Sequence, residues 1–364
     1  MKLKKRITDI IFVFLICTLI LSVAAATIFL PKRSFSQKEN RPLANAPELS
    51  AKGLINGSYF EAFSLFVKDQ IPLRDAFVSA HSVSELLFGK MQVNGIIASK
   101  GNILIALPQH NTEKIKNSIQ KIQSITQNRA IIYTPPRSID IFSSALPVFY
   151  DYGEQTEIFS VLPENTQRML KSYLSYADHN DYYKTDHHWT TDGAFRAYKQ
   201  ICDELNIKAF EPSHFTKNTV TTSFRGTSFS RSGLPEFAVD AEKILLYRYD
   251  GDINVSVINH ETTEETKGFY SYSALEASDK YKLFLGGNYS HLSIKAASDQ
   301  EKPKLLLIKD SFANSLIPFL ALHYDIEAID PRYCAKSFLE KCLAEDGYND
   351  ILVLLSLDTL DDIF

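Results

Sequence analysis

The stretch that decides the fold is KPKLLLIKDSFANSLIPFLALHYDIEAIDPRY, residues 302–333. Residues 305–308 form an unbroken apolar run, which is typical of a strand buried on both faces. A helix is predicted to follow from about residue 312 to 322. Ser311 is thereby predicted at the carboxyl edge of a strand and at the start of a helix. In open α/β sheets this edge is where ligands bind, so Ser311 is the first candidate for a functional residue.

The rest of the chain repeats this alternation of apolar strands and amphipathic helices. Residues 206–300 are less regular and contain hairpin-like pieces, and one more helix and strand follow residue 333. This order favours an α/β fold with a mostly parallel sheet. Strands are predicted at residues 102–108 and 129–136, and helices at 111–126, 162–177 and 190–205.

An apolar segment near the N-terminus, residues 10–30, holds 21 residues without a charge. About 20 apolar residues are needed to cross the hydrocarbon core of a bilayer. The preceding residues 1–9, MKLKKRITD, are basic, which places the N-terminus in the cytoplasm and the main domain outside. A cleaved signal peptide is the alternative, because SVAAA offers small residues. The run exceeds the usual apolar length of about 7–15 residues, so an uncleaved single-pass anchor in the cell membrane is favoured.

The segment after the anchor is polar and carries two prolines. Residues 34–50, SFSQKENRPLANAPELS, therefore read as a linker. Two amphipathic helices follow on either side of Pro72, and their mixed charges favour packing on the main domain over lying on the bilayer. The expected organisation is a cytoplasmic tail (1–9), a transmembrane helix (10–30), a linker with membrane-proximal helices (31–93) and an extracytoplasmic domain (94–364).

Charge and cysteine content exclude several classes of function. Residues 1–33 hold six of the 39 basic residues and one of the 43 acidic ones, so the remainder has a net charge of −9. A domain this acidic is a poor candidate for binding nucleic acid through phosphates. The four cysteines form no disulfide framework and no CxxC pair. No acetyl-CoA site is apparent, and no cofactor is expected.

The chemistry is predicted to come from TDHHW, residues 185–189. In an extended segment Asp186 and His188 point the same way and His187 points the other way. A serine nucleophile needs a base, and the base needs an orienting acid. Asp186 and His188 can supply both to Ser311. The alternatives are that this serine, or the aspartate before it, only caps a helix, and that TDHHW is an ordinary polar turn.

The same residues also allow a second interpretation, a metal site. Asp186, His187 and His188, with His179 and His291, are enough ligands for zinc. Adjacent histidines diverge on a strand, however, and the sequence has neither HExxH nor paired cysteines. We therefore expect no metal at this motif.

A rival serine site lies in FRGTSFSRSG, residues 224–233, where Ser228 or Ser230 follows a glycine. The preceding residues are polar, so a glycine-rich substrate loop is the favoured interpretation. Arg225 and Arg231 there either face solvent or bind an anionic sugar. Trp189 is expected to pack in the core.

Several motifs, taken in order, resemble those of the DHHW protein family. They are ENRPLANAPEL (39–49), DQIPLRD (69–75), KTDHHWT (184–190) and IDPRY (329–333), within a match that runs from about residue 37 to 364. This family is similar to the alginate O-acetyltransferases, which carry an SGNH-hydrolase-like domain behind a targeting segment. The resemblance implies a three-layer SGNH-like sandwich, in which Asp186, His188 and Ser311 are the catalytic residues.

The oxyanion hole is expected in FLGGNYSH, residues 284–291. Gly287 allows a close backbone approach and Asn288 can donate from its side chain, although the stretch also reads as a hairpin turn. SGNH relatives use a glycine and an asparagine for this purpose. The resemblance adds Arg332 and Tyr333 of the IDPRY motif as substrate residues. SGNH enzymes usually read Gly-Asp-Ser, and this chain departs from them by carrying Lys309 in place of the glycine.

The sequence thus predicts a membrane-anchored extracytoplasmic enzyme of acyl esters. An O-acetyltransferase or acetylesterase acting on a cell-surface polysaccharide fits best. The transferase form implies a multi-span membrane acyltransferase as partner, which hands acetyl groups across the membrane. The alternative is a non-catalytic polysaccharide-binding or assembly protein with a degenerate site, which Lys309 favours.

Overall fold

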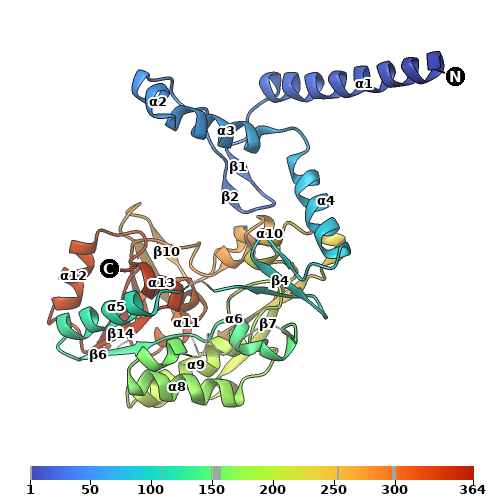
Figure 1. Ribbon diagram of the computed structural model, residues 1–364. Helices are drawn as coiled ribbons and strands as arrows, with labels where there is room; N and C mark the ends of the chain where they lie inside the picture. The colour runs from blue at the N-terminus through green and yellow to red at the C-terminus, as the bar shows by residue number, and fades with distance from the viewer. Residues whose placement is uncertain (1, 109, 149, 151–156, 252–253, 297–300) are drawn as a thin grey trace. The chain divides into compact units, whose positions relative to one another are not determined.

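The structure is a computed structural model that describes all residues except 1, 109, 149, 151–156, 252–253 and 297–300. The chain forms two compact units. One comprises residues 1–90 with 233–235, and the other comprises residues 91–232 with 236–364 (Figure 1). Each unit is described by itself.

The first unit is mostly helical. Its first helix contains an apolar span from Asp9 to Phe29 with a mean hydropathy of 2.7, which is long and apolar enough to cross a membrane. The two helices expected on either side of Pro72 are present, and the break falls where the proline was expected to end the first of them. The elements are α1 (Lys2–Phe29), β1 (Phe35–Ser36), β2 (Arg41–Pro42), α2 (Ala51–Asn56), α3 (Ser58–Gln70) and α4 (Arg74–Leu87).

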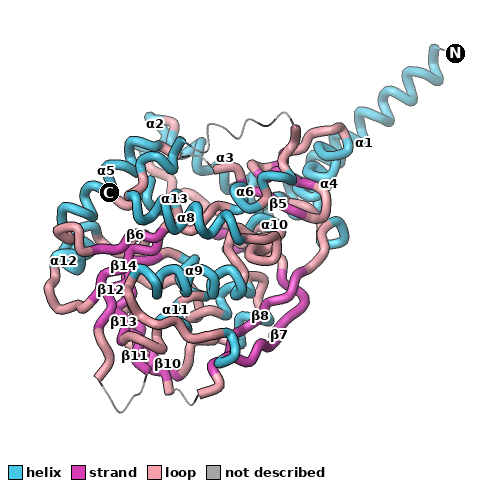
Figure 2. Tube along the Cα trace, turned by 90° about the horizontal axis from the view of Figure 1, so that it is seen from below, coloured by secondary structure: helices cyan, strands magenta, loops and turns pink. Residues whose placement is uncertain are grey.

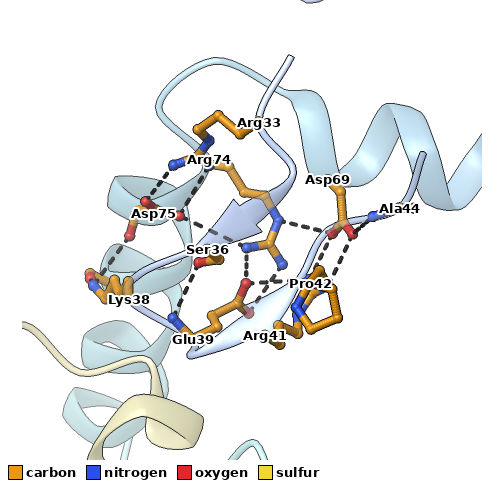
Figure 3. Close-up of polar contacts among 11 residues, drawn as sticks. Arg33, Ser36, Lys38, Glu39, Arg41, Pro42, Ala44, Asp69, Arg74 and Asp75 are labelled. Carbon is orange, nitrogen blue, oxygen red and sulfur yellow. Dashed lines mark hydrogen bonds and ion pairs between the residues drawn. The ribbon is translucent and has the colours of Figure 1, made fainter. Parts of the chain in front are cut away.

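Part of the segment expected to be a linker is folded. Residues 35–42 form the β1–β2 hairpin, which ion pairs attach to α3 and α4 (Figure 3). Residues 43–50 have no regular secondary structure. Arg41 contacts Asp69 at 2.7 Å, and Arg74 pairs with Glu39. Two motifs that lie about thirty residues apart in the sequence therefore fold against each other through opposite charges. A search for apolar periodicity cannot detect such pairing.

The second unit is built on a seven-stranded sheet of order β10-β9-β11-β13-β12-β14-β6. Figure 2 shows most of these strands side by side. The sheet is mixed rather than mostly parallel, because the irregular region before residue 300 adds an antiparallel edge. The parallel strands are β6 (Ala130–Tyr133), β12 (Lys304–Lys309), β13 (Asp325–Ile329) and β14 (Asp350–Leu354); the antiparallel ones are β9 (Val255–Asn259), β10 (Glu265–Lys267) and β11 (His291–Ala296).

Strand β12 is buried on both faces, as its apolar run predicted. Leu305 and Leu307 belong to one hydrophobic core, and Leu306 and Ile308 belong to another. The first core includes residues of α9 (Thr191–Glu204) and α11 (Ile317–Leu320); the second includes residues of α5 (Thr112–Ile125), α12 (Lys336–Ala344) and α13 (Leu357–Asp362). Helices therefore cover the two faces of the sheet. The carboxyl end of β12, which precedes Ser311, lies at the edge formed by the strand ends.

Two smaller sheets and several short helices complete the second unit. The strand expected at residues 102–108 exists, but it pairs in a separate three-stranded sheet. The elements are β3 (Gln92–Val93), β4 (Ile96–Ser99), β5 (Ile103–Ala106), β7 (Phe215–Phe224), β8 (Glu242–Tyr249), α6 (Ser138–Ile141), α8 (Glu164–Tyr176), α10 (Thr227–Ser232), η1 (Ser143–Ala145), η2 (Ile158–Val161), η3 (Pro212–His214), η4 (Glu236–Ala238), η5 (Tyr272–Glu276) and η6 (Lys280–Leu283).

The long helix expected after β12 is replaced by two short pieces. A 3₁₀ helix, η7 (Ser311–Ser315), comes first, and α11 follows from residue 317. Pro318 explains the break, since its ring would clash with the preceding turn of a helix begun at residue 312. Pro318 is tolerated here because it sits in the first turn of α11.

Candidate active site

The DHHW motif forms a tight turn rather than the expected extended segment. Tyr182 and Trp189 make an isolated β-bridge, and the Tyr183 amide donates to the His188 carbonyl at 3.2 Å. The rings of His187 and His188 consequently do not diverge, and their centroids lie 3.8 Å apart. Trp189 is fully buried, as expected of a core residue.

Three side chains meet in one hydrogen-bonded chain at the edge of the sheet. His188 Nε2 lies 2.8 Å from Ser311 Oγ, and His188 Nδ1 lies 2.5 Å from Asp186 Oδ1. The serine and the histidine are 123 residues apart in the sequence. All three side chains are buried, with residue exposures of 1% for Asp186, 3% for His188 and 8% for Ser311. This geometry lets the imidazole accept the serine proton while the carboxylate holds its other nitrogen.

The first residue of α10 holds the second oxygen of Asp186. Thr227 donates to Asp186 Oδ2 from its amide at 2.6 Å and from its hydroxyl at 3.0 Å. A Cβ atom on Gly226 would lie only 2.0 Å from the same oxygen. Any side chain at this position would therefore displace the carboxylate.

Sequence reasoning missed this role of the Gly-Thr pair. Residues 224–233 were expected to be a glycine-rich substrate loop, whereas residues 227–232 form α10, whose first residue, Thr227, orients Asp186. The available signal was a glycine followed by a hydroxyl residue ahead of a helix, a pattern common at helix starts. Nothing in it indicates which carboxylate the turn receives.

Electrostatics keep Asp186 ionised. Burial by itself raises the pKa of the Asp186 carboxyl, but His188 and His187 lie next to it and favour the charged form. Hydrogen bonds from His188 and from the Thr227 amide act in the same direction, so the pKa falls far below its usual range. A permanently charged carboxylate is what stabilises an imidazolium during proton transfer.

Aromatic contacts fix the plane of the His188 ring. Tyr281 stacks on it with a centroid distance of 4.0 Å and an interplanar angle of 8°, and Phe312 lies at 4.9 Å. Trp189 Nε1 donates to the Phe312 carbonyl at 3.0 Å, which joins the DHHW turn to η7. Burial raises the pKa of Tyr281 well above its usual value, so this residue stays a neutral phenol. Tyr281 was another residue that the sequence did not reveal.

Asp310 performs the capping, which leaves the Ser311 hydroxyl for His188. Asp310 Oδ1 accepts from the Phe312 amide at 3.0 Å, at the start of η7. Its Oδ2 accepts from the Ser356 amide at 2.7 Å and the Thr359 hydroxyl at 3.0 Å. The carboxylate thus ties the end of β12 to the segment after β14.

Lys309 is wholly buried and connects the serine turn to the segment with Gly287 and Asn288. Its Nζ donates to Asn314 Oδ1 at 2.7 Å. Asn314 Nδ2 in turn donates to Asn288 Oδ1 at 3.0 Å and to the Gly287 carbonyl at 3.3 Å. Burial lowers the pKa of Lys309 to about 8, against the nearby negative charge of Asp330.

The four expected oxyanion and substrate residues divide into two pairs. Gly287 and Asn288 contact the serine turn through their oxygens, as described above, and the Gly287 amide donates weakly to the Phe284 carbonyl at 3.4 Å. The guanidinium of Arg332 donates two hydrogen bonds to the Asp330 carboxylate, at 2.7 and 2.9 Å, and lies over the ring of Tyr333. Arg332 is therefore committed to Asp330 rather than to the three residues at the centre of the site.

A cavity of about 270 Å³ is partly lined by His187 and Phe312, whose rings lie next to that of His188. Arg137, Arg231 and Asp358 line other parts of it, so the lining carries both signs of charge. His187 is held by a 2.6 Å contact between its Nδ1 and the Thr227 hydroxyl.

The rival serine lacks a base. Ser228 is buried, and its hydroxyl has no hydrogen-bond partner within the described part of the chain. Arg225 bonds to the carbonyls of Val239 and Glu236, and Arg231 lies at the exposed end of α10. Ser228 therefore has none of the contacts that make Ser311 a candidate nucleophile.

Asp186, His187 and His188 present ligand atoms within 4.8 Å of one another, close enough to hold a metal ion. Each of these side chains already makes a directed hydrogen bond, to Thr227, to Ser311 or within the trio. The arrangement is that of a proton-transfer chain.

Comparison with known proteins agrees with this architecture. Residues 158–329 match the family model described as DHHW protein. Over these residues the chain is similar to the DHHW family. The family resemblance inferred from the motifs is thereby confirmed. No curated protein matches the sequence.

Two solved structures share the fold over about three quarters of the chain. A DHHW family protein from Eubacterium siraeum has a TM-score of 0.58 at 19% identity, over 74% of this chain and 93% of that one. Bacillus cereus PatB1, determined with a sulfonyl adduct, has a TM-score of 0.58 at 20% identity, over 73% and 95%. The O-acetyltransferase domain of Pseudomonas putida AlgJ is more distant, with a TM-score of 0.38 at 14% identity, over 74% and 93%.

Proposed function

We propose that this protein is a serine enzyme of acyl esters, in which Ser311 is the nucleophile, His188 the base and Asp186 the orienting acid. The observation that carries the proposal is the continuous contact from Ser311 Oγ through His188 to Asp186, at 2.8 and 2.5 Å. Asp-x-His precedes the serine in the chain, which is the order expected of the alginate O-acetyltransferases and the reverse of ordinary SGNH order. The sulfonyl adduct of PatB1 is consistent with it, since sulfonyl reagents attach to activated hydroxyl groups.

In the first half-reaction Ser311 Oγ attacks the carbonyl carbon of an acyl ester, and His188 Nε2 takes the hydroxyl proton. The tetrahedral intermediate carries its negative charge on the former carbonyl oxygen. When it collapses, the ester C–O bond breaks and His188 returns the proton to the leaving alcohol. The acyl group remains on Ser311. A sugar hydroxyl or water then attacks in the second half-reaction by the same proton route, which releases the transferred or hydrolysed product.

The oxyanion hole is assigned to Gly287 and Asn288. Because Asn314 holds the side-chain oxygen of Asn288, the amide nitrogen of Asn288 is the end left to act as donor. Charge developing on the acyl oxygen needs donors that are already fixed in place. The bonds of Asn314 to both residues provide that fixation.

The substrate is assigned to a cell-surface polysaccharide, and acetyl is the expected acyl group. The apolar span from Asp9 to Phe29 would anchor the chain in the cell membrane, with residues 1–9 in the cytoplasm and the catalytic unit outside. An enzyme held there meets envelope polymers rather than cytoplasmic metabolites. In the transferase version a multi-span membrane acyltransferase supplies the acetyl group.

The test is hydrolysis of p-nitrophenyl acetate by the full chain in detergent. We expect Ser311→Ala and His188→Ala to lower kcat by about 10⁴-fold or more. Ser228→Ala is the matched control, because it removes the rival buried serine and should leave the rate unchanged. Equal rates for all four proteins would leave only the non-catalytic polysaccharide-binding or assembly role. Addition of acetylated and unmodified polysaccharide then separates transfer from hydrolysis by the acetyl content of the polymer.

A further inference from the structure

A second group of polar side chains lies on the antiparallel side of the main sheet. His260 stands in the turn that follows β9, His291 begins β11, and Glu327 lies in β13. These elements are neighbours, since β11 pairs with both β9 and β13. Ser293, two residues along β11 from His291, is opposite Glu327 in the register. None of the roles assigned to the triad uses these residues.

The polar atoms of this group converge. His291 Nε2 lies 2.8 Å from Glu327 Oε2, and Ser293 Oγ donates to the same oxygen at 2.6 Å. His260 Nε2 lies 2.7 Å from Ser293 Oγ, and the two imidazole rings stack with centroids 3.9 Å apart. One ligand atom from each of the two histidines and Glu327 lies within 4.8 Å of the others.

The group is anchored on one side and open on the other. Phe338 of α12 packs against the His291 ring at 5.8 Å, while His260 is exposed. A carboxylate and two imidazoles therefore converge on one point that solvent can reach, which is the setting in which a cation can enter.

We propose that His260, His291 and Glu327 form a binding site for a zinc-class divalent cation. Two imidazole nitrogens and one carboxylate oxygen are ligands that Zn²⁺ takes at about 2.0–2.2 Å. The three ligand atoms must move slightly closer to one another to reach these distances. A small rotation of the stacked imidazole rings allows this. On binding, the ion replaces the proton that each Nε2 contributes to these hydrogen bonds; that proton leaves to solvent, and each neutral imidazole holds its single proton on Nδ1. Ser293 stays bonded to Glu327 and holds the carboxylate in place, as supporting residues do at metal sites.

The position of the site gives the ion a structural role. His291 follows the segment that carries Gly287 and Asn288, and the Ser290 amide donates to Glu261 in the same turn as His260. A cation shared by three chain segments would hold this end of the sheet together. It would also fix the base of the segment assigned to the oxyanion hole.

The test is zinc content and Zn²⁺ affinity of the full chain in detergent, by elemental analysis after dialysis and by competition with a chromophoric chelator. We expect one tightly bound Zn²⁺ in the wild type. His291→Ala and Glu327→Gln should each weaken binding by at least about a hundredfold, and Ser293→Ala by about 10- to 100-fold. Replacement by Co²⁺ should give visible absorption bands of a nitrogen- and oxygen-ligated ion.

Two controls and one further ligand variant make the result decisive. His187→Ala removes a ligand from the other candidate cluster and should leave Zn²⁺ binding unchanged. His214→Ala removes an exposed histidine elsewhere and should do the same. His260→Ala should weaken binding, and because it alters an exposed turn it tests ligation with little risk of unfolding, which circular dichroism checks. A wild type without bound zinc, or ligand variants that bind it as tightly as the wild type, would overturn the proposal. Zinc content is measured separately from esterase activity, so the test does not depend on the proposed catalysis.

Discussion

The ammonium group of Lys309 donates a 2.7 Å hydrogen bond to Asn314 Oδ1, and both side chains are buried. This contact gives a physical account of the lysine that stands where SGNH enzymes usually carry glycine. The lysine contacts the asparagine that holds Gly287 and Asn288, so we infer that it supports the proposed site. Its effect on Ser311 chemistry is therefore one of positioning.

Replacing Lys309 tests that role. In Lys309→Met the side chain keeps its bulk but Asn314 Oδ1 loses its donor, so the segment with Gly287 and Asn288 is less firmly held. Because oxyanion donors act in the transition state, we expect kcat for ester hydrolysis to fall by about 10- to 100-fold with little change in KM.

The matched control is Lys304→Met, which removes an exposed lysine from the other end of the same strand. It should match the wild type in both kinetic constants. A Lys309→Met enzyme with unchanged kcat, or with a change confined to KM, would exclude the positioning role.

The close approach of Gly226 to Asp186 gives a second prediction. In Gly226→Ala the new methyl group would overlap the carboxylate, since a Cβ there lies 2.0 Å from Asp186 Oδ2. The carboxylate must move away from His188, and we expect kcat to fall by at least about a hundredfold. Gly347→Ala is the control, because its Cβ meets nothing closer than Glu345 Oε1 at 3.9 Å. Full activity in Gly226→Ala would mean that the position of Asp186 does not matter.

The stacking of Tyr281 on His188 can be separated from its hydroxyl contacts. The hydroxyl bonds to Ser315 Oγ and the Ser311 carbonyl are long, at 3.3 and 3.4 Å, whereas the rings are in close parallel contact. We expect Tyr281→Phe to retain nearly full activity. Tyr281→Leu should lose up to about tenfold in kcat, in keeping with the 0.5–1.5 kcal/mol of an aromatic pair. The two variants are compared in the same ester assay. If they were equally active, stacking would not be what orients the imidazole.

The sequence contained enough information for the chemical centre but not for its surroundings. Asp186 and His188 are two residues apart, and Ser311 follows a strand with a clear apolar run, so local patterns made all three candidates and the family resemblance combined them. Their contact depends on the turn at residues 182–189 and on how it meets β12. The cradle formed by Gly226 and Thr227 comes from a segment forty residues away in the chain, and no local pattern points to it.

In the fold, too, local sequence patterns predicted some features, whereas features that depend on long-range contacts were missed. The two-sided burial of β12 and the helices around Pro72 follow from period and proline placement. The single helix expected from residue 312 is not formed. Its apolar composition favours a helix, but Pro318 interrupts it. The prediction of a linker at residues 34–50 did not foresee the hairpin at residues 35–42. That hairpin is held by charges paired across the chain, and charge pairing has no sequence period.

The ion pair between Arg41 and Asp69 should make the stability of the first unit depend on pH. The guanidinium of Arg41 lowers the pKa of Asp69 to about 2, helped by the Ala44 amide and opposed by burial. Since an unfolded aspartate titrates at about 3.9, the unfolded state binds more protons between these values. Asp69 therefore contributes stability that is complete above about pH 4 and is lost as the pH falls toward 2, with a full size of about 2 kcal/mol.

Hydrogen exchange of residues 33–47 measures this contribution directly. In the wild type, protection of the hairpin amides should decline as the pH falls from 4 to 2, after correction for intrinsic exchange. Asp69→Asn should show lower protection at pH 7 and little further pH dependence, because the charge that favours folding is already absent. Glu61→Gln, on the exposed side of the same helix, should behave as the wild type. Undiminished protection in Asp69→Asn would show that the hairpin is held by contacts other than the Arg41–Asp69 pair.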